Sequence, residues 1–463
     1  MVNMSHSSLS LNLRSHETVL DFLSDQGYRV EFTSWDVSDL PDRARELIGS
    51  MSLVSHYDDD VAPFQVFLTE LDVPRQVKRI RRTDLRIILE PFYRRYPQGD
   101  YLFIFALPNY ASVALVSPKR IRGEPRQPIL PEEVATTKLQ LRILTLDPRH
   151  LYHTDLWVLE QIRLGPQDQT AEVIWQKHLA AFDVERVTRQ FYEGYKTVLA
   201  ILKAELAAQR RVGATPAQVQ AFAQQLLNRL MFLYFVQKKG WLRWNGEPDP
   251  HYLRSLWERY RDGERTADGG FHGWLQALFL DAFNNCRAAV AANPALPDDV
   301  RASFLGMPFL NGGLFEQNDL DELGFSVADE FFVQLFDRFE REEPGFLERY
   351  NFTIDESTPL DVEVAVDPEM LGKVYESLVA EEERHAAGIF YTPREEIDYM
   401  CRLSLIEYLH EQTGYPKDDL IPLVMEPRRL LETPEACPER ERGNGIVPFG
   451  GLSQTRQHEA LRV

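Results

Sequence analysis

The sequence predicts an α+β protein that is mostly helical, with a small mixed α/β domain at the N-terminus and helices after it. Apolar residues alternate in short segments between residues 64 and 146, which is the period of half-buried strands. From about residue 170 they recur at steps of three and four, as on amphipathic helices. The 463 residues, 44% apolar and 26% charged, are typical of a globular protein of two or three domains.

The predicted strands of the N-terminal domain follow one another closely. They are FQVFLTEL (64–71), YLFIFAL (101–107), SVALVSP (112–118) and LQLRILTL (139–146). The second and third are joined by PNYA, which predicts a hairpin-like turn. Between the first two strands, residues 83–96 begin like a helix at Thr83, and Pro91 predicts a break or a kink in it.

Two long helices are predicted next, each with a capping residue in front of it. Asp183 can cap the first of them. Thr215 and Pro216 open the second, which ends at Gly240 and is apolar all round near its end, as expected of the central helix of a bundle. Further helical segments are predicted near 251–261, 273–291, 329–342 and 367–384.

These patterns divide the chain into five predicted parts. They are a disordered tail (1–18), an α/β domain (19–165), a helical connector domain (166–365), the start of a further domain (366–430) and a disordered tail rich in Pro, Gly and charge (431–463).

Composition indicates a cytoplasmic protein without a membrane span. No secretory signal is visible at the N-terminus, and the longest apolar run, LMFLYFV at 230–236, is too short to cross a bilayer. The three cysteines, Cys286, Cys401 and Cys437, lack zinc-ligand spacing and fit a reducing compartment. The net charge of −20 does not by itself indicate nucleic acid, although local basic clusters can still bind it.

One basic cluster stands out in this acidic chain. VKRIRRTDLR at 77–86 is followed by Arg94 and Arg95, and a solvated face is the ordinary interpretation of such a charge run. The concentration of arginine in one strand–helix unit favours a contact with the phosphate backbone of DNA about as strongly. The candidate DNA-binding residues are Lys78, Arg79, Arg81, Arg82 and Arg86.

HYDDDVAPFQVFLTELD at 56–72 invites comparison with a magnesium nuclease. Such a site needs an acidic residue and then a strand carrying Glu-x-Lys or Asp-x-Lys, so that carboxylates hold the metal and lysine orients water. Asp58, Asp59 or Asp60 could supply the first acid and Glu70 the second, which makes the N-terminal domain nuclease-like. Asp72 stands where the lysine should be, so we interpret the domain as degenerate; a loop followed by an edge strand is the alternative.

Two apolar motifs have a structural explanation that suffices. FLNGGLFE at 309–316 predicts a tight turn through Gly312 and Gly313, or a backbone surface close to a ligand or DNA. LNRLMFLYFVQKKGWL at 227–242 is mostly core, and Lys238 and Lys239 complement the helix dipole, with a phosphate contact as the second interpretation.

GIFYTP at 388–393 combines a helix start with two aromatic residues. Thr392 suits the N-cap, Pro393 the first helical position, and Glu395 completes a capping box. That ordinary helix start does not require the aromatic pair in front of it. Adjacent aromatic rings at a helix N-terminus could instead wall an adenine or sulfonium ligand, with the helix start facing a carboxylate.

These motifs together resemble a known family. LGKVYESL (371–378) followed by AAGIFYTPREEIDYM (386–400) is similar to the entry of the adenine-specific amino-methyltransferases of type II, type IIG-like, restriction–modification systems. The segments quoted above occur in that family's order, so the resemblance covers roughly residues 55–430. It implies the start of a methyltransferase domain at 366–430 and duplex DNA as a partner.

The resemblance also implies a partial site for S-adenosylmethionine. In the family, a stretch called motif X closes over this cofactor, and the matching residues here are Gly388, Phe390, Tyr391, Thr392 and Pro393. Magnesium would be a second cofactor if the nuclease-like site is active. Members with a fused nuclease carry lysine at the position of Asp72.

Two motifs that the family needs for catalysis do not occur in these 463 residues. They are the D-P-A-C-G-S-G type cofactor loop and the N-P-P-[YF] loop that binds the flipped adenine. We therefore expect a truncated fragment or a subunit of a restriction–modification or phage-defence system that is inactive alone. A separate chain that carries the catalytic domain is a candidate partner. A non-catalytic DNA-binding or assembly subunit and a magnesium nuclease are the alternatives.

Overall fold

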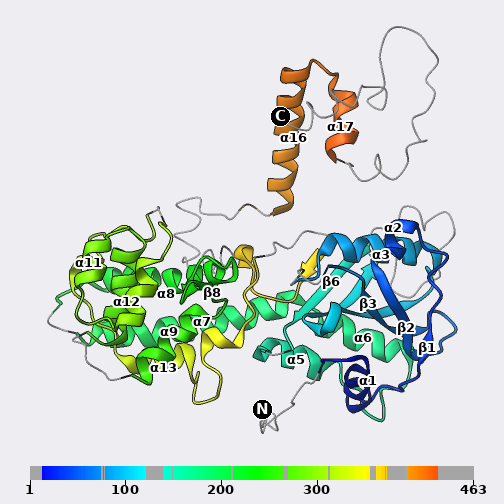
Figure 1. The fold of residues 1–463 in the computed structure, drawn as a ribbon, viewed down its shortest axis with the longest axis horizontal. Helices are drawn as coiled ribbons and strands as arrows, with labels where there is room; N and C mark the ends of the chain where they lie inside the picture. The colour runs from blue at the N-terminus through cyan, green and yellow to red at the C-terminus, as the bar shows by residue number, and fades with distance from the viewer. Residues whose placement is uncertain are drawn as a thin grey trace. The chain divides into compact units, whose positions relative to one another are not determined.

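The predicted α+β, mostly helical class is confirmed by a computed structural model (Figure 1). The structure describes residues 13–74, 77, 79–120, 139–148, 150–209, 212–263, 269–310, 313–354, 361–370, 372, 392 and 394–425. The chain divides into two compact units, residues 1–374 and 375–463.

Within the described ranges of the first unit, seven strands form one mixed sheet in the order β1-β2-β3-β4-β5-β6-β9. The strands are β1 (Thr33–Ser34), β2 (Ile48–Tyr57), β3 (Phe64–Leu71), β4 (Asp100–Ala106), β5 (Val113–Arg120), β6 (Leu139–Leu146) and β9 (Asp361–Glu363). β2 and β3 form an antiparallel hairpin, whereas β3 and β4 run parallel. The four strands predicted from alternation are therefore confirmed, whereas β1, β2 and β9 were not predicted from the sequence.

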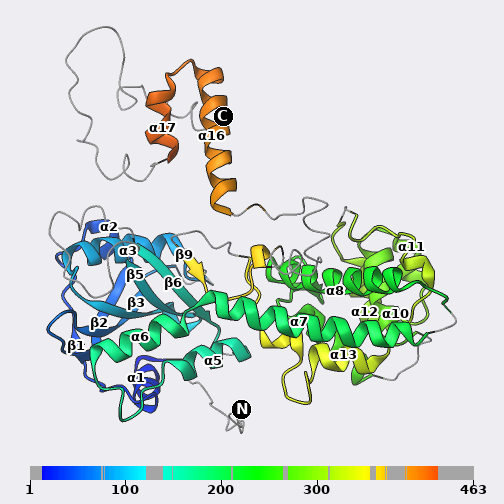
Figure 2. The same cartoon turned by 180° about the vertical axis from the view of Figure 1, so that it is seen from behind.

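Helices cover both faces of this sheet (Figure 2). α3 (Arg82–Arg95) crosses from β3 to β4 and packs Leu89 and Phe92 against Phe67 of β3. The opposite face carries α6 (Ala171–Ala181), whose His178 ring lies 4.9 Å from the ring of Phe64. The remaining helices of this part are α1 (His16–Asp25), α2 (Asp42–Arg45), the 3₁₀ turn η1 (Pro108–Tyr110) and α5 (His153–Gln161).

α3 does not break at Pro91, contrary to one of the two outcomes that the sequence predicted. The helix continues to Arg95, although proline removes one backbone donor from its interior. Ile88, Leu89 and Phe92 are fully buried against the sheet, and this burial stabilises the helix on both sides of the proline.

The helical region is inserted between two neighbouring strands. β9 follows ten described helical segments in the chain, from α7 to η4, yet it pairs in parallel with β6, with Ile143 opposite Glu363. The helices are α7 (Val184–Ala207), α8 (Pro216–Lys238), α9 (Tyr252–Arg261), α10 (Gly270–Gln276), η2 (Ala277–Ala282), α11 (Arg287–Ala292), α12 (Asp298–Leu305), η3 (Asp321–Leu323), α13 (Asp329–Phe336) and η4 (Phe346–Arg349). A short hairpin, β7 (Arg243–Trp244) and β8 (Glu247–Pro248), follows α8.

The predicted helix ends at the long helices agree with the structure. Asp183 accepts a hydrogen bond from the Glu185 N–H in front of α7, and Thr215 forms a capping box with Gln218 in front of α8. Gly240 has φ +73°, the left-handed conformation that glycine adopts most readily after a helix.

In the second unit, α16 (Arg394–Thr413) packs against α17 (Lys417–Met425) through Ile406, Leu420 and Val424. The predicted tails lie outside the described residues, apart from 13–18, and so does most of the predicted helix at 367–384. Among the helices that the structure describes, none is both long and apolar enough to span a bilayer.

A buried histidine beneath the sheet predicts acid sensitivity. His178 is 1% exposed, its Nε2 lies 2.7 Å from the Tyr28 hydroxyl, and burial, followed by the Arg142 and Lys177 charges, lowers its pKa to about 3. A histidine in the unfolded chain titrates near ~6.5, so below that pH the unfolded state binds the extra proton. The stabilisation is therefore complete above pH ~6.5 and is lost as the pH falls towards 3.

We expect the free energy of unfolding to fall between pH 6.5 and 5 by roughly 2 kcal/mol more in the wild type than in His178→Gln. Urea denaturation of both proteins at each pH measures this difference. Equal losses in the two proteins would contradict a neutral buried imidazole at this position.

Candidate functional site

Glu70, a predicted nuclease acid, lies near the end of β3 opposite Ser50 of β2. The Ser50 hydroxyl donates to one Glu70 carboxylate oxygen over 2.9 Å, and the Tyr110 hydroxyl donates to the other over 2.5 Å. Burial, and then this hydrogen bond to Glu70, raise the pKa of the Tyr110 hydroxyl. Tyr110 has φ +54°, a conformation that costs an aromatic residue roughly 1–3 kcal/mol. Both oxygens of Glu70 are thus held by hydroxyl donors.

The structure does not bring the other predicted acids to Glu70. Asp58, Asp59 and Asp60 lie in the loop between β2 and β3, at the opposite end of the hairpin. Glu70 is six residues along β3 from Phe64, which corresponds to about 20 Å at the rise of a strand. Asp59 instead accepts a hydrogen bond from the Val61 N–H over 2.8 Å, so its oxygen stabilises the loop.

The surroundings of Glu70 do not fit a magnesium site. Asp72 follows β3 as an exposed carboxylate, where the predicted site would need a lysine. Across the part of the chain that the structure describes, no group of three or more His, Cys, Asp or Glu residues is placed to hold a metal. Each Glu70 oxygen accepts a hydrogen bond from a hydroxyl, and no second carboxylate of the predicted site lies beside it to share a metal ion.

Arg86 and Arg82 of the predicted basic cluster pair with carboxylates. Arg86 is 4% exposed; its Nε donates to Asp361 over 2.7 Å and its Nη1 to Glu90 over 2.8 Å. Arg82, in the first turn of α3, lies 3.4 Å from the Glu363 carboxylate. These ion pairs attach α3 to β9. Arg86 is buried, whereas the Arg82 side chain is 18% exposed.

The other basic residues differ in their surroundings. Arg79 and Arg81 are exposed immediately before α3. Arg95 is exposed at the end of the helix and pairs with Asp39 over 3.0 Å. Lys78 lies outside the described residues. The fold thus buries Arg86, partly covers Arg82 and exposes Arg79 and Arg81.

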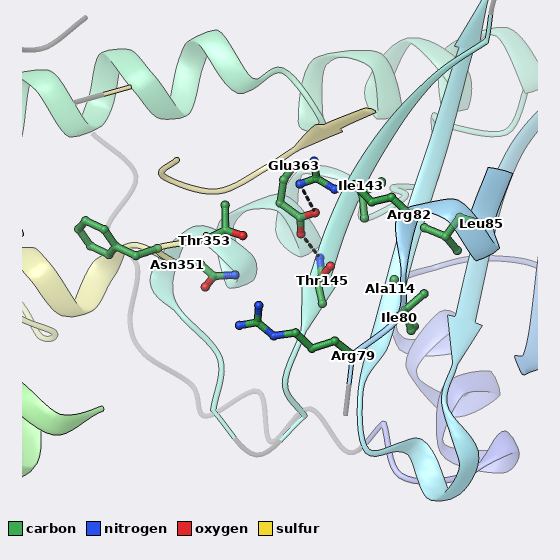
Figure 3. Close-up of a pocket in the computed structure, with 11 residues that line it drawn as sticks. Arg79, Ile80, Arg82, Leu85, Ala114, Ile143, Thr145, Asn351, Thr353 and Glu363 are labelled. Atoms are coloured by element: carbon green, nitrogen blue, oxygen red, sulfur yellow. Dashed lines mark hydrogen bonds and ion pairs between the residues drawn. The ribbon is translucent and has the colours of Figure 1, made fainter. Parts of the chain in front are cut away.

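Arg79 and Arg82 border a small cavity (Figure 3). The cavity has a volume of about 60 Å³ and lies between the start of α3, the ends of β6 and β9, and residues 351–353. Glu363 is held there by Arg82 and by the Thr145 N–H, which donates over 3.1 Å. Of the lining residues, only Arg79 and Arg82 were singled out in the sequence.

A group of buried titratable side chains lies within electrostatic range of this cavity. Lys238, at the end of α8, donates to the Tyr152 hydroxyl over 2.5 Å. Burial, and then the charge of Arg79, lower the pKa of Lys238 to about 8. Asp155 is 1% exposed, and its burial raises its pKa to about 7. The sequence predicted Lys238 as a dipole partner, with a phosphate contact as the second interpretation, and no local pattern around Asp155 indicates that the fold buries it.

The FLNGGLFE motif is held by a buried ion pair. Arg229 of α8 pairs with Asp321 over 2.6 Å and donates to the Leu314 carbonyl over 2.7 Å. Gly312 lies outside the described residues, and the φ of Gly313 is not in the left-handed region. The predicted tight turn with positive φ is therefore not found at Gly313.

The predicted cofactor residues fall almost entirely outside the described part of the chain. Gly388, Phe390, Tyr391 and Pro393 are not described, and Thr392 is exposed just ahead of α16. The partial S-adenosylmethionine site stays a prediction.

Comparison with known proteins gives one partial similarity. The chain is 31% identical over 189 residues to a protein of Methanocaldococcus jannaschii named "Putative type II restriction enzyme and methyltransferase". The match covers 39% of this chain and 14% of that protein, so the chain spans a small part of its relative's length. No family model matches. No solved structure matches either. The similarity supports a relation between part of this chain and restriction–modification enzymes.

Proposed function

We propose that this chain is a fragment or subunit of an S-adenosylmethionine-dependent, site-specific DNA adenine methyltransferase of a restriction–modification or phage-defence system. It binds duplex DNA, contributes one wall of the cofactor site through Gly388–Pro393, and transfers no methyl group by itself. The observation that carries this proposal is the 31% identity to the M. jannaschii protein, whose name joins restriction and methylation.

The incomplete site is the physical reason for expecting no activity. Methyl transfer needs donor and acceptor held in one geometry and an amine-polarising loop, and the 463 residues contain neither the cofactor loop nor the N-P-P-[YF] loop. The nuclease alternative finds little support, because Glu70 is engaged by Ser50 and Tyr110 and is separated from Asp59. The role that remains for the sheet is structural or DNA-binding.

The purified chain, incubated with duplex DNA and S-adenosylmethionine labelled on its methyl group, is expected to leave the DNA unlabelled. Calorimetric titration with the same cofactor is expected to give weak binding that Tyr391→Ala abolishes. Tyr399→Ala, which removes an exposed aromatic of α16, is the matched control and should bind like the wild type.

Robust methyl transfer by the chain alone would show that the site is complete. Absence of both cofactor binding and DNA binding would overturn the assignment to a methyltransferase.

A further inference from the structure

The cavity beside α3 has walls that backbone hydrogen bonds hold in place. The Val364 N–H donates to Ile143 over 2.8 Å, which continues the pairing of β9 with β6. The Val366 N–H donates to the Asn351 carbonyl over 2.7 Å, and the Thr353 N–H donates back to Val366 over 2.9 Å. Residues 351–353 are therefore fixed against the same strand that carries Glu363. The cavity is a preorganised feature of the sheet edge.

The acidic group and the hydrogen-bond donors lie on different sides of the cavity. Glu363 is held on one side by Arg82 and the Thr145 N–H. On the other side, Figure 3 shows the Arg79 guanidinium extending towards Asn351, with Thr353 nearby. A guanidinium, an amide and a hydroxyl are the donor types that proteins use to bind phosphate oxygens.

Charges of both signs surround the cavity: the Glu363 carboxylate is paired with Arg82 on one side, and the Arg79 guanidinium lies on the other. The charge of Arg79 contributes to the lowered pKa of Lys238, so these two cations lie within electrostatic range of each other. An anion placed beside Arg79 would attract both cations. A volume of about 60 Å³ accommodates a group of a few heavy atoms.

We propose that this cavity binds one phosphate group, with Arg79 as the cation and Asn351 and Thr353 as hydrogen-bond donors. The inference rests on the proposed function, because it names the duplex DNA backbone as the source of that phosphate. A free phosphate or the phosphate of a nucleotide has the same chemistry, and the experiment distinguishes these sources.

The test is a salt titration of duplex DNA binding by the full chain. Each phosphate contact contributes about −0.9 to the slope of log K against log salt, so Arg79→Ala should make the slope shallower by about one. Thr353→Val removes one donor without changing charge, so it should weaken binding roughly tenfold at fixed salt with the slope unchanged. Arg338→Ala, at an exposed arginine that does not line the cavity, is the charge-matched control and should keep both affinity and slope.

Calorimetric titration with inorganic phosphate is the second arm. Phosphate binding by the wild type that Arg79→Ala removes supports the cavity as an anion site whether or not DNA binds. If DNA binds and Arg79→Ala and Thr353→Val both leave slope and affinity unchanged, the cavity inference fails and the proposed function stands. If DNA does not bind but phosphate does, the DNA part of the proposed function fails and the cavity stands as a free-phosphate site. If neither DNA nor phosphate binds, the cavity inference and the DNA part of the proposed function both fail.

Discussion

Arg86→Ala is expected to lower the free energy of unfolding by roughly 3–5 kcal/mol, because it leaves a buried carboxylate without its counter-charge. Arg86 is 4% exposed and Asp361 is 7% exposed, and their side chains are joined over 2.7 Å. The Arg86 guanidinium also donates to the Leu139 carbonyl at the start of β6. Loss of the Arg86 guanidinium would therefore weaken the attachment of β9, the strand that returns the chain to the sheet after the inserted helices. Urea denaturation followed by circular dichroism measures the change.

Arg95→Ala is the matched control on the same helix. Arg95 and Asp39 are 60% and 50% exposed, and such surface pairs contribute about 0–1 kcal/mol. Comparable stability losses in the two variants would show that Arg86 is not a buried structural cation. If Arg86→Ala stays folded but fails to bind DNA, the original prediction of a phosphate contact at Arg86 would be restored.

Asp321→Ala is expected to cost a similar amount, roughly 3–5 kcal/mol, in the helical region. It leaves the Arg229 guanidinium buried, because the side chains of both residues are 4% exposed. The Leu314 and Glu316 carbonyls would still accept from Nε and Nη2 of Arg229, but Nη1 would lose the Asp321 oxygen that accepts from it. Thermal and urea unfolding measure the loss.

A double substitution separates the ion pair from simple packing. Arg229→Met with Asp321→Leu removes both charges, so it should be less destabilised than Asp321→Ala alone. Arg338→Ala, which breaks an exposed pair with Glu343, should change stability by at most about 1 kcal/mol. A double variant that is less stable than Asp321→Ala would indicate that the pair contributes net stability through its geometry.

The sequence predicted those strands and helix ends that depend on residues close to one another in the chain. β3 and β6 have the predicted extents because their apolar residues alternate with the strand period. The caps at Asp183 and Thr215 were recognisable because a capping residue bonds to backbone within three positions. β2 was missed because IGSMSLVSHY does not alternate; Ser52 and Ser55 are buried inside the sheet.

For the candidate site residues, the sequence did not predict which side chains would lie next to one another. Glu70 was named from its place on a strand, but its partners Ser50 and Tyr110 come from the hairpin register and from a turn of unusual backbone conformation. Asp59 was grouped with Glu70 because it is near in sequence, and the hairpin places it at the far end of the strands. Closeness in sequence therefore does not predict closeness in space here. In an antiparallel pair, the first residues of one strand lie opposite the last residues of the next strand.

By itself the sequence determined the fold class, most of the sheet, the long helices and a basic segment ahead of α3. Only the tertiary structure decided how those arginines are used. It buried Arg86 against Asp361, about 275 residues further along the chain, paired Arg82 with Glu363, and placed both Arg79 and Arg82 beside a cavity. The reason is that β9 is a three-residue strand with no periodic signal, and its place next to β6 depends on the folding of the whole insertion between them.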